Sequence, residues 1–219
     1  QGAVNTIVDL NSEFSIGSSD KILALSSLSF DLSVYDIFGL LFAGGEIVIP
    51  NPSCVSPPDP AEWYDLVVSQ RVTIWDTVPA FVELLVSHCE FLGVRLPSFM
   101  RLIYMSGDWI PVTLPPRIRA VSDCADLQIV SMGGATEAAV WSNQFILGKE
   151  GSGIPEGWAS VPYGRPMRNQ RMYILNERLE HCEVWVQGGI YIGGAGVASG
   201  YYKNPERTAY QFITHPVTG

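Results

Sequence analysis

The sequence predicts an α/β fold: a doubly wound parallel sheet followed by a smaller β-rich part. Over the first 130 residues, short apolar runs alternate with amphipathic segments at a spacing of about 25 residues, which is the pattern of strands and crossover helices in a parallel sheet. After residue 145, glycine and proline become frequent and strand patterns prevail. Hydrophobic residues make up 47% of the chain and charged residues 16%, a balance that supports a core and excludes intrinsic disorder.

The expected strands are short and apolar on both sides, as strands buried on both faces of a parallel sheet should be. They are residues 22–27, 46–50, 72–76, 101–105 and 127–131. The expected helices lie between them, at residues 33–43, 60–70, 79–91 and 112–121. Gly44 and Gly45 end the first helix. Asp59 caps the second, and Pro115 and Pro116 fit the first turn of the last.

The β-rich part contains expected strands at 171–175, 183–187 and 190–193, and a helix pattern returns at about residue 204. The glycine-rich segment 151–160 indicates a junction between the two parts. We therefore predict an α/β unit at residues 1–150 and a β-rich unit at residues 151–219.

Charge and cysteine content exclude several classes of protein. The 13 basic and 22 acidic residues give a net charge of −9, the wrong sign for a nucleic-acid binder. Charged residues interrupt the most apolar region, so no run of about 18 apolar residues predicts a membrane span. The first ten residues show no signal-peptide pattern, so we expect a cytoplasmic protein. The four cysteines include no CxxC pair of a zinc or redox site.

Ligands of open α/β sheets bind at the carboxyl ends of the strands, which directs attention to the loops after the expected strands. These loops contain Phe30–Ser33, Asp76–Thr77, Ser106–Asp108 and Met132–Glu137. All four carry a carboxylate, and two carry glycines that allow a close approach of ligand to backbone. Taken singly, each has an ordinary explanation: Asp31 fits a helix cap, and Gly107 with Asp108 fits a turn.

The loop at residues 131–137 (SMGGATE) points most clearly to a nucleotide. Backbone N–H groups of its glycines and the hydroxyl of Thr136 suit phosphate oxygens, and Glu137 suits Mg²⁺. The chain has no GxxxxGK[ST] loop and no GxGxxG after the first strand, which disfavours P-loop and dinucleotide folds. A Ser-His-Asp hydrolase is also disfavoured, because no histidine follows the end of an expected strand.

Four segments together resemble the core motifs of a known family. They are FDLSVYDIF (30–38), GGATEAAVW (133–141), YGRPMRNQRMYIL (163–175) and GGIYIGGAGVASGYY (188–202). The chain resembles, over essentially its whole length, the amino-acid adenylation domains of nonribosomal peptide synthetases. These domains belong to the adenylate-forming superfamily, together with acyl-CoA synthetases and luciferases.

The resemblance implies a flavodoxin-like subdomain followed by part of a small β-barrel. It implies an enzyme that uses ATP and Mg²⁺ to convert an amino acid to an aminoacyl-AMP, which then loads the thiol of a peptidyl carrier domain. Asp31 would pair with the substrate ammonium group. Thr136 and Glu137 would be the catalytic residues at the ATP phosphates, with Glu137 on the metal. The nucleotide would also contact Ser106, Gly107, Asp108, Gly133 and Gly134.

Several positions depart from the family pattern. Gly133 stands where an aromatic residue usually stacks on adenine, and Ala135 stands for a proline; GGATE is nevertheless a known variant, prominent among cysteine-activating domains. Ser131 stands where asparagine is common, and Gly189 replaces a glutamate for no evident reason. The family's phosphate loop, TGD motif and lysine-bearing C-terminal subdomain do not occur in these residues. We therefore expect an internal piece of a synthetase that is inactive by itself.

The resemblance also places the residues of the amino-acid pocket. They are Asp31, Leu32, Tyr35, Asp76, Tyr104, Ser106, Met132, Val140 and Trp141. Three aromatic rings and a methionine leave room for a small side chain. The set resembles the cysteine-selecting pattern, with Asp76 in place of asparagine, so cysteine is favoured. Serine, alanine or an amino acid with a short amine-bearing side chain are the alternative substrates. Tyr35 and Trp141 have a second explanation, since both residues could serve only to pack the core.

The sequence leaves two alternative functional classes. One is a binding module that holds an amino acid, a nucleotide or a carrier protein without catalysis. The other is an acyl-CoA ligase, which Asp31 argues against, because a carboxylate at the pocket would repel a fatty acid.

Overall fold

The computed structural model describes residues 1–148 and 154–215. A seven-stranded sheet has the order β2-β1-β3-β4-β5-β6-β7, and a separate two-stranded sheet is formed by β8 and β9. The strands of the large sheet are β1 (Lys21–Leu23), β2 (Glu46–Val48), β3 (Ile74–Thr77), β4 (Leu102–Met105), β5 (Gln128–Gly133), β6 (Asn143–Leu147) and β7 (Arg165–Pro166). The first five strands are parallel, and β6 and β7 are antiparallel to their neighbours. The predicted fold class, a doubly wound and mostly parallel sheet, is confirmed.

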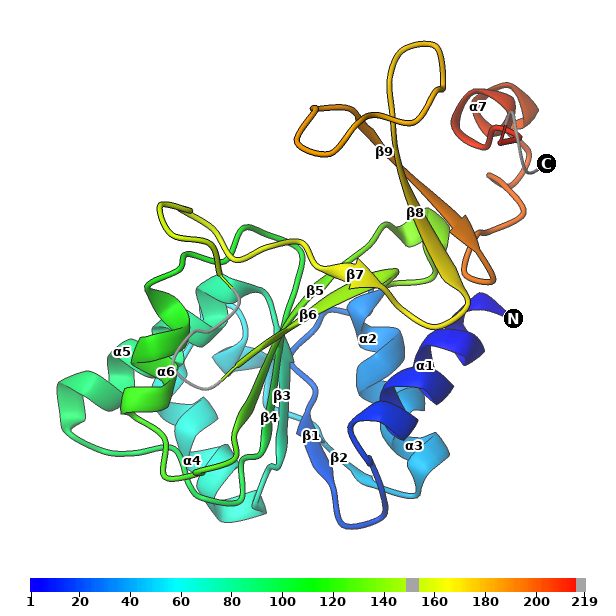
Figure 1. Cartoon of the computed structure of the whole chain (residues 1–219). Coiled ribbons are helices and arrows are strands. Elements are labelled where there is room, and N and C mark those ends of the chain that lie inside the picture. The colour runs from blue at the N-terminus through cyan, green and yellow to red at the C-terminus, as the bar shows by residue number, and fades with distance from the viewer. Residues whose placement is uncertain (149–153, 216–219) are drawn as a thin grey trace.

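Helices cover both faces of the large sheet (Figure 1). One face is covered by α1 (Gly2–Glu13), α2 (Leu32–Val34), the π-helical turn η1 (Tyr35–Gly39) and α3 (Leu40–Ala43). The other face is covered by α4 (Pro60–Gln70), α5 (Pro79–Leu92) and α6 (Leu114–Ala120). Each face has its own hydrophobic cluster, because alternate residues of each strand point to opposite sides. Ile74 and Trp75, for example, are neighbours on β3 but belong to different clusters.

The predicted helix ends are confirmed where a capping signal was present. The Asp59 carboxylate accepts hydrogen bonds from the backbone N–H groups of Ala61 (3.0 Å) and Glu62 (3.2 Å), which starts α4. Gly44 ends α3 with φ +76°, a conformation that glycine adopts without a Cβ penalty. Pro115 and Pro116 lie in the first turn of α6, where the missing N–H groups cost nothing.

The described residues form one α-helix and two strands that the sequence patterns did not predict: α1, β6 and β7. The expected strand at 183–187 is wrong. Residues 183–186 form a turn closed by the Val186 N–H donating to the Glu183 carbonyl (3.0 Å). Trp185 has φ +71° and is 88% exposed, which is incompatible with an extended, half-buried strand. Its central residues are apolar, but none of the described strands pairs with them.

The β-rich part consists, among the described residues, of β8 (Gln170–Leu175) and β9 (Gly189–Gly194), followed by α7 (Pro205–Gln211). Figure 1 shows this pair of strands projecting away from the large sheet, with α7 beside it. Because β7 joins the large sheet, residues beyond 150 contribute to the α/β unit. The division near residue 150 stays a prediction. None of the described helices is long and apolar enough to cross a membrane.

Candidate functional site

The predicted strand-end loops meet at one edge of the sheet. Strand order reverses between β1 and β3, because β2 lies outside β1 and β4 outside β3, and such a switch point is where α/β proteins bind ligands. The register pairs Asp76 of β3 with Tyr104 of β4, so that both side chains stand on the same face of the sheet. Loops that are far apart in the sequence therefore lie together at this edge of the sheet, on the side that α1, α2 and η1 cover.

Asp31 immediately precedes α2 but does not cap it. Its side chain forms no capping hydrogen bond and is half-buried. The Ser33 hydroxyl turns back to donate to the Phe30 carbonyl (2.7 Å) instead. The carboxylate of Asp31 is thus left available for a ligand, and the helix-cap explanation loses its support.

A π-helical turn, η1, presents the adjacent residues Tyr35 and Asp36 to the interior. The extra residue of a π-turn shifts the helical register, and such turns are frequent at functional sites. Asn11 of α1 holds this turn in place. Its side-chain amide donates to the Gly39 carbonyl (2.8 Å), and its oxygen accepts from the Tyr35 hydroxyl (3.0 Å). Sequence reasoning missed Asn11, since nothing in the sequence links α1 to this helix.

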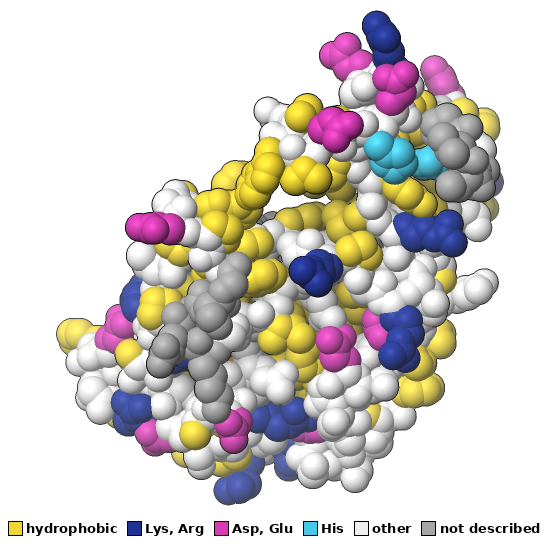
Figure 2. Space-filling model, viewed as in Figure 1, with side chains coloured by type: hydrophobic (Ala, Val, Ile, Leu, Met, Phe, Trp, Pro, Cys, Tyr) yellow, Lys and Arg dark blue, Asp and Glu magenta, His cyan; other side chains and the backbone are white. Residues whose placement is uncertain are grey.

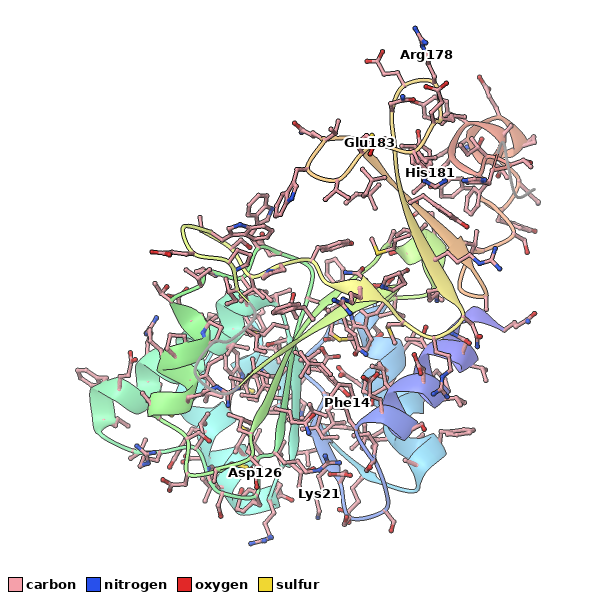
Figure 3. All side chains as sticks on the ribbon, viewed as in Figure 1. Phe14, Lys21, Asp126, Arg178, His181 and Glu183 are labelled. Carbon is pink, nitrogen blue, oxygen red and sulfur yellow. The ribbon has the colours of Figure 1, made fainter. Side chains whose placement is uncertain are left out.

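Three aromatic rings of the predicted pocket pack against one another. Ring centroids lie 5.7 Å apart for Tyr35 and Tyr104, 5.3 Å for Tyr35 and Trp141, and 5.9 Å for Tyr104 and Trp141. Phe14, the C-cap residue that follows α1, adds an edge-on contact with Tyr104 at 5.4 Å and lies between α1 and the sheet (Figure 3). All three pocket rings belong to the hydrophobic cluster of this face, so packing alone accounts for the burial of Tyr35 and Trp141. Their part in binding remains a prediction.

A second carboxyl group accompanies Asp76 in the interior. Asp76 and Asp36 are 0% and 1% exposed. Asp36 lies against Asp76 and Ser26, whose contacts oppose part of the rise in its pKa, but no contact of either carboxyl group has good hydrogen-bond geometry among the described residues. Burial raises the pKa of Asp36 to about 7. Burial, and then the neighbouring charge of Asp36, raise the pKa of Asp76 well above its ordinary value. Two carboxyl groups so placed hold at least one proton between them.

Two other buried polar atoms near this pair, the Ser106 Oγ and the Trp141 Nε1, lack hydrogen-bond partners among the described residues. The Tyr104 hydroxyl lies near Tyr35, and burial and then this neighbour raise the pKa of Tyr104, but the contact lacks good hydrogen-bond geometry. A buried polar group without a partner is costly, and its presence near a predicted pocket points to a missing polar ligand. Asp36 was not among the predicted site residues. The available signal was its position: a charged residue between Tyr35 and Ile37, in an otherwise apolar helix.

The remaining predicted pocket residues surround this group from β5 and the following loop. Met132, near the end of β5, is buried, as is Val140, and Leu32 of α2 is half-buried. Met132 and Val140 belong to the same hydrophobic cluster as the three rings, and Leu32 packs against it. The structure thus places the predicted amino-acid pocket residues in one region.

A cavity of about 640 Å³ lies beside this region. Its lining combines two of the predicted loops with a segment that was not predicted: Gly107–Ile110, Ser131–Gly134, Trp158–Val161 and Tyr163. Four predicted nucleotide contacts, Gly107, Asp108, Gly133 and Gly134, therefore share one cavity. Ser106 is buried and is not among the lining residues. Asp108 is exposed, and its carboxylate accepts a hydrogen bond from the Trp109 N–H (2.7 Å).

Thr136 and Glu137 form the short turn η3 (Thr136–Ala138) after β5. Thr136 is exposed. The Tyr201 hydroxyl donates to the Glu137 carboxylate, and this hydrogen bond lowers the pKa of Glu137. The Arg207 guanidinium lies 4.4 Å from the centroid of the Tyr201 ring. Tyr201 was not predicted as a site residue, because it lies 64 positions from Glu137 in the sequence.

No group of three metal-binding side chains occurs in the part of the chain that the structure describes. Mg²⁺ in nucleotide sites is bound by one or two carboxylates together with substrate phosphates. A single ionised Glu137 therefore fits such an ion. The histidines offer no catalytic triad, and His181 lies in the β-rich part, far from Phe14 and the strand-end loops (Figure 3).

These observations define an α/β protein with a ligand site at the strand ends, and comparison with known proteins identifies its family. A family profile described as "AMP-binding enzyme" matches residues 1–202. The chain belongs to this family, and its resemblance to the adenylation domains of nonribosomal peptide synthetases is confirmed.

The chain is 42% identical to the anguibactin system regulator of Vibrio anguillarum over 97% of its own length and 20% of that protein. It is 41% identical to bacitracin synthase 1 of Bacillus licheniformis over 98% of its length and 4% of that protein. Similarly, it is 41% identical to the pyochelin synthetase PchF of Pseudomonas aeruginosa over 97% of its length and 11% of that protein. The chain thus spans a fifth or less of these relatives.

Among solved structures, the nonribosomal peptide synthetase FmoA3 in its α-methyl-L-serine-AMP bound form has a TM-score of 0.92 and 40% identity, and the match covers all of this chain and 24% of that one. FmoA3 has also been solved in an AMPPNP-bound form. A four-domain synthetase, AB3403, matches at 23% identity with a TM-score of 0.81 over 98% of this chain and 15% of that one, which shows the fold alone.

Proposed function

We propose that this chain forms the amino-acid pocket and part of the ATP site of an adenylation domain that activates a small amino acid. In the proposed reaction, an oxygen of the substrate carboxylate attacks the α-phosphorus of ATP. The new P–O bond forms as the bond to the β-phosphate bridge breaks, and pyrophosphate leaves with the electron pair. The aminoacyl-AMP then acylates the thiol of a peptidyl carrier domain.

The observation that carries the proposal is a group of buried polar side chains at and beside the predicted pocket residues, several of whose atoms make no hydrogen bond of good geometry with the described residues. The carboxyl groups of Asp36 and Asp76, together with Tyr104, Ser106 and Trp141, present both acceptors and donors. A ligand that enters this space recovers their hydrogen bonds. Asp31, at the same edge of the sheet and without a capping role, supplies the counter-charge for the α-ammonium group.

We further propose that the substrate side chain is small and donates a hydrogen bond to Asp76, with cysteine the first choice. Three mutually packed rings limit the volume, and a carboxyl pair at the floor selects a donor. A thiol or a hydroxyl meets both conditions, and so does a short amine. The amino-acid adenylate bound to FmoA3, at 40% identity, carries a small hydroxyl-bearing side chain and belongs to the same class.

ATP fits the neighbouring cavity. Gly134 leaves no room for a side chain, since a Cβ there would lie 2.5 Å from the Val140 carbonyl oxygen, so backbone lines this part of the cavity. Glu137 is the residue that would hold Mg²⁺, and Thr136 would contact phosphate. A bound Mg²⁺ would neutralise charge on the phosphate oxygens.

The test is amino-acid-dependent ATP–pyrophosphate exchange by the full-length protein across an amino-acid panel, with wild type compared with Asp76→Asn. If the substrate is cysteine or serine, the substitution leaves activity nearly unchanged or improves it, because asparagine keeps the shape without the charge. If it is a short diamino acid, activity falls about 10²- to 10³-fold, the effect of losing a charged hydrogen bond.

Three outcomes contradict the proposal. Equal loss on every amino acid would make Asp76 a structural residue and remove the pocket assignment. ATP and amino-acid binding without exchange would favour a binding module, and exchange driven by fatty acids in place of amino acids would favour an acyl ligase.

A further inference from the structure

The aromatic ring of Tyr163 occupies the space next to Gly133 at the end of β5. A Cβ at position 133 would lie 2.2 Å from Cε2 and 2.6 Å from Cζ of Tyr163, and 2.7 Å from the Asn143 side-chain nitrogen. The Tyr163 ring therefore packs directly on the glycine backbone and makes the closest contacts. No side chain at position 133 is compatible with the ring where it stands. The two residues are 30 positions apart in the sequence, yet they share one site.

The position of Tyr163 is fixed from both sides. The Asn143 side-chain amide, from β6, donates to the Tyr163 backbone carbonyl, and Asn143 is itself fully buried and pairs with Gly133 in the sheet. The next residue, Gly164, has φ +99°, and a Cβ there would lie 2.1 Å from the Gln144 carbonyl oxygen. Only glycine lets the chain lie this close to β6. The backbone N–H of Gly134 lies beside the Tyr163 hydroxyl and lowers its pKa, although burial raises that pKa by more.

Tyr163 is 44% exposed, and it lines the same 640 Å³ cavity as Gly107, Asp108, Gly133 and Gly134. An aromatic ring that is held rigidly in place and still faces a cavity offers a flat apolar surface. Planar heterocyclic bases stack on such surfaces. Figure 2 shows that hydrophobic side chains surround the hollow between the large sheet and the β-rich part.

We propose that Tyr163 is the residue on which the purine base of ATP stacks, and that Gly133 is a glycine because its neighbour's ring takes that space. The base enters between the Tyr163 ring and the backbone around Gly107. This proposal rests on the proposed function for its choice of nucleotide. Tyr163 acts on binding of the base and not on the amino acid or the phosphates.

The experiment measures three constants for the full-length protein: the Kd of ATP by isothermal titration calorimetry, the inhibition constant of tripolyphosphate, and the KM of the amino acid. Tyr163→Ala weakens ATP binding about 10- to 100-fold, the range expected for a stacked base. Tyr163→Phe keeps ATP binding within about threefold. Tripolyphosphate, which has no base, inhibits each variant as it inhibits wild type. Tyr210→Ala, at an 83% exposed tyrosine of α7, is the matched control and changes nothing.

A double-mutant cycle tests the spatial relation. Gly133→Ala alone displaces the ring and weakens ATP binding, whereas in the Tyr163→Ala background the same substitution costs much less. Non-additivity of this kind is expected for residues in contact or coupled through a shared cavity, and not for distant, independent residues. Additive effects would overturn the claim that the ring dictates the glycine.

The other outcomes separate this inference from the proposed function. If wild type binds ATP and Tyr163→Ala does not weaken it, or if Trp109→Ala produces the loss instead, the stacking assignment is wrong and the proposed function stands. If Tyr163→Ala weakens ATP and tripolyphosphate equally, Tyr163 is a structural residue of the loop. If wild type does not bind ATP at all, both proposals are overturned.

Discussion

Replacement of Asp36 by asparagine tests the buried carboxyl pair directly. Asp36 is almost fully buried, and burial raises its pKa from 3.8 to about 7. Below pH 4 the folded and unfolded chains both hold the proton. Between pH 4 and pH 7 the unfolded chain ionises and the folded chain does not, so the free energy of unfolding falls as the pH rises. Above pH 7 both are ionised and the loss levels off.

The magnitude follows from the shift in pKa. A shift of roughly 3 pKa units corresponds to about 4 kcal/mol of stability that is present at pH 4 and absent at pH 8. Asparagine does not titrate, so Asp36→Asn removes this loss. It also removes the charge that helps to raise the pKa of Asp76. We expect the variant to gain on wild type by about 4 kcal/mol between pH 4 and pH 8, which is about 8–16 °C in Tm for a domain of this size.

The assay is thermal unfolding of wild type, Asp36→Asn and a control at pH 4.5, 6 and 8. Asp65→Asn is the matched control, because Asp65 is an exposed carboxylate on α4 and its neutralisation should leave the pH profile unchanged. A profile for Asp36→Asn that runs parallel to wild type would refute the reasoning, since it would mean that Asp36 titrates normally in the folded protein.

Three further predictions concern the site. Asp31→Ala should raise the amino-acid KM by two or more decades with little change for ATP, since removing one partner of a buried ion pair costs about 3–5 kcal/mol; an unchanged amino-acid KM would contradict the assignment. Tyr201→Phe removes the donor to Glu137, so the Mg²⁺ concentration for half-maximal exchange should rise about 3- to 10-fold, and identical Mg²⁺ curves would show that the contact is dispensable. Gly164→Ala, at φ +99° with its Cβ meeting backbone, should cost at least about 1 kcal/mol of stability by thermal unfolding; a variant as stable as wild type would show that the loop relaxes freely.

The parallel sheet was predictable because its signals are local. Each buried strand is a short apolar run, and capping residues such as Asp59 and Gly93 mark the ends of helices within a few positions. The missed strands β6 and β7 are less buried than the central parallel strands β3 and β4, and each forms as the antiparallel partner of the strand before it. β7 is only two residues long and exists through its pairing with β6. Conversely, the apolar run at 183–187 has strand character but no partner among the described strands, so it forms a turn.

The candidate site was predictable in the parts that lie at strand ends, because topology alone brings those loops together. The parts that were missed are supplied by distant segments: Asn11 from α1, Tyr163 from the loop before β7, and Tyr201 from the β-rich part. The hydrophobic periodicity of a segment predicts which of its residues are buried. It does not predict which side chain from a distant segment each buried residue contacts. Tyr163 contacts Gly133 only because β6 pairs with both β5 and β7 in the folded sheet.

Asp36 shows a different reason for failure. A carboxylate in a predicted helix normally indicates a solvated face. In the π-turn at Tyr35–Gly39, however, Tyr35 and Asp36 are both buried. Burial of the Asp36 carboxyl group costs stability at neutral pH, while Asn11 stabilises the turn that contains it. Asp36 also lies close enough to Asp76 to raise its pKa, which is why we expect two carboxyl groups, and not one, to contact the side chain of the amino acid.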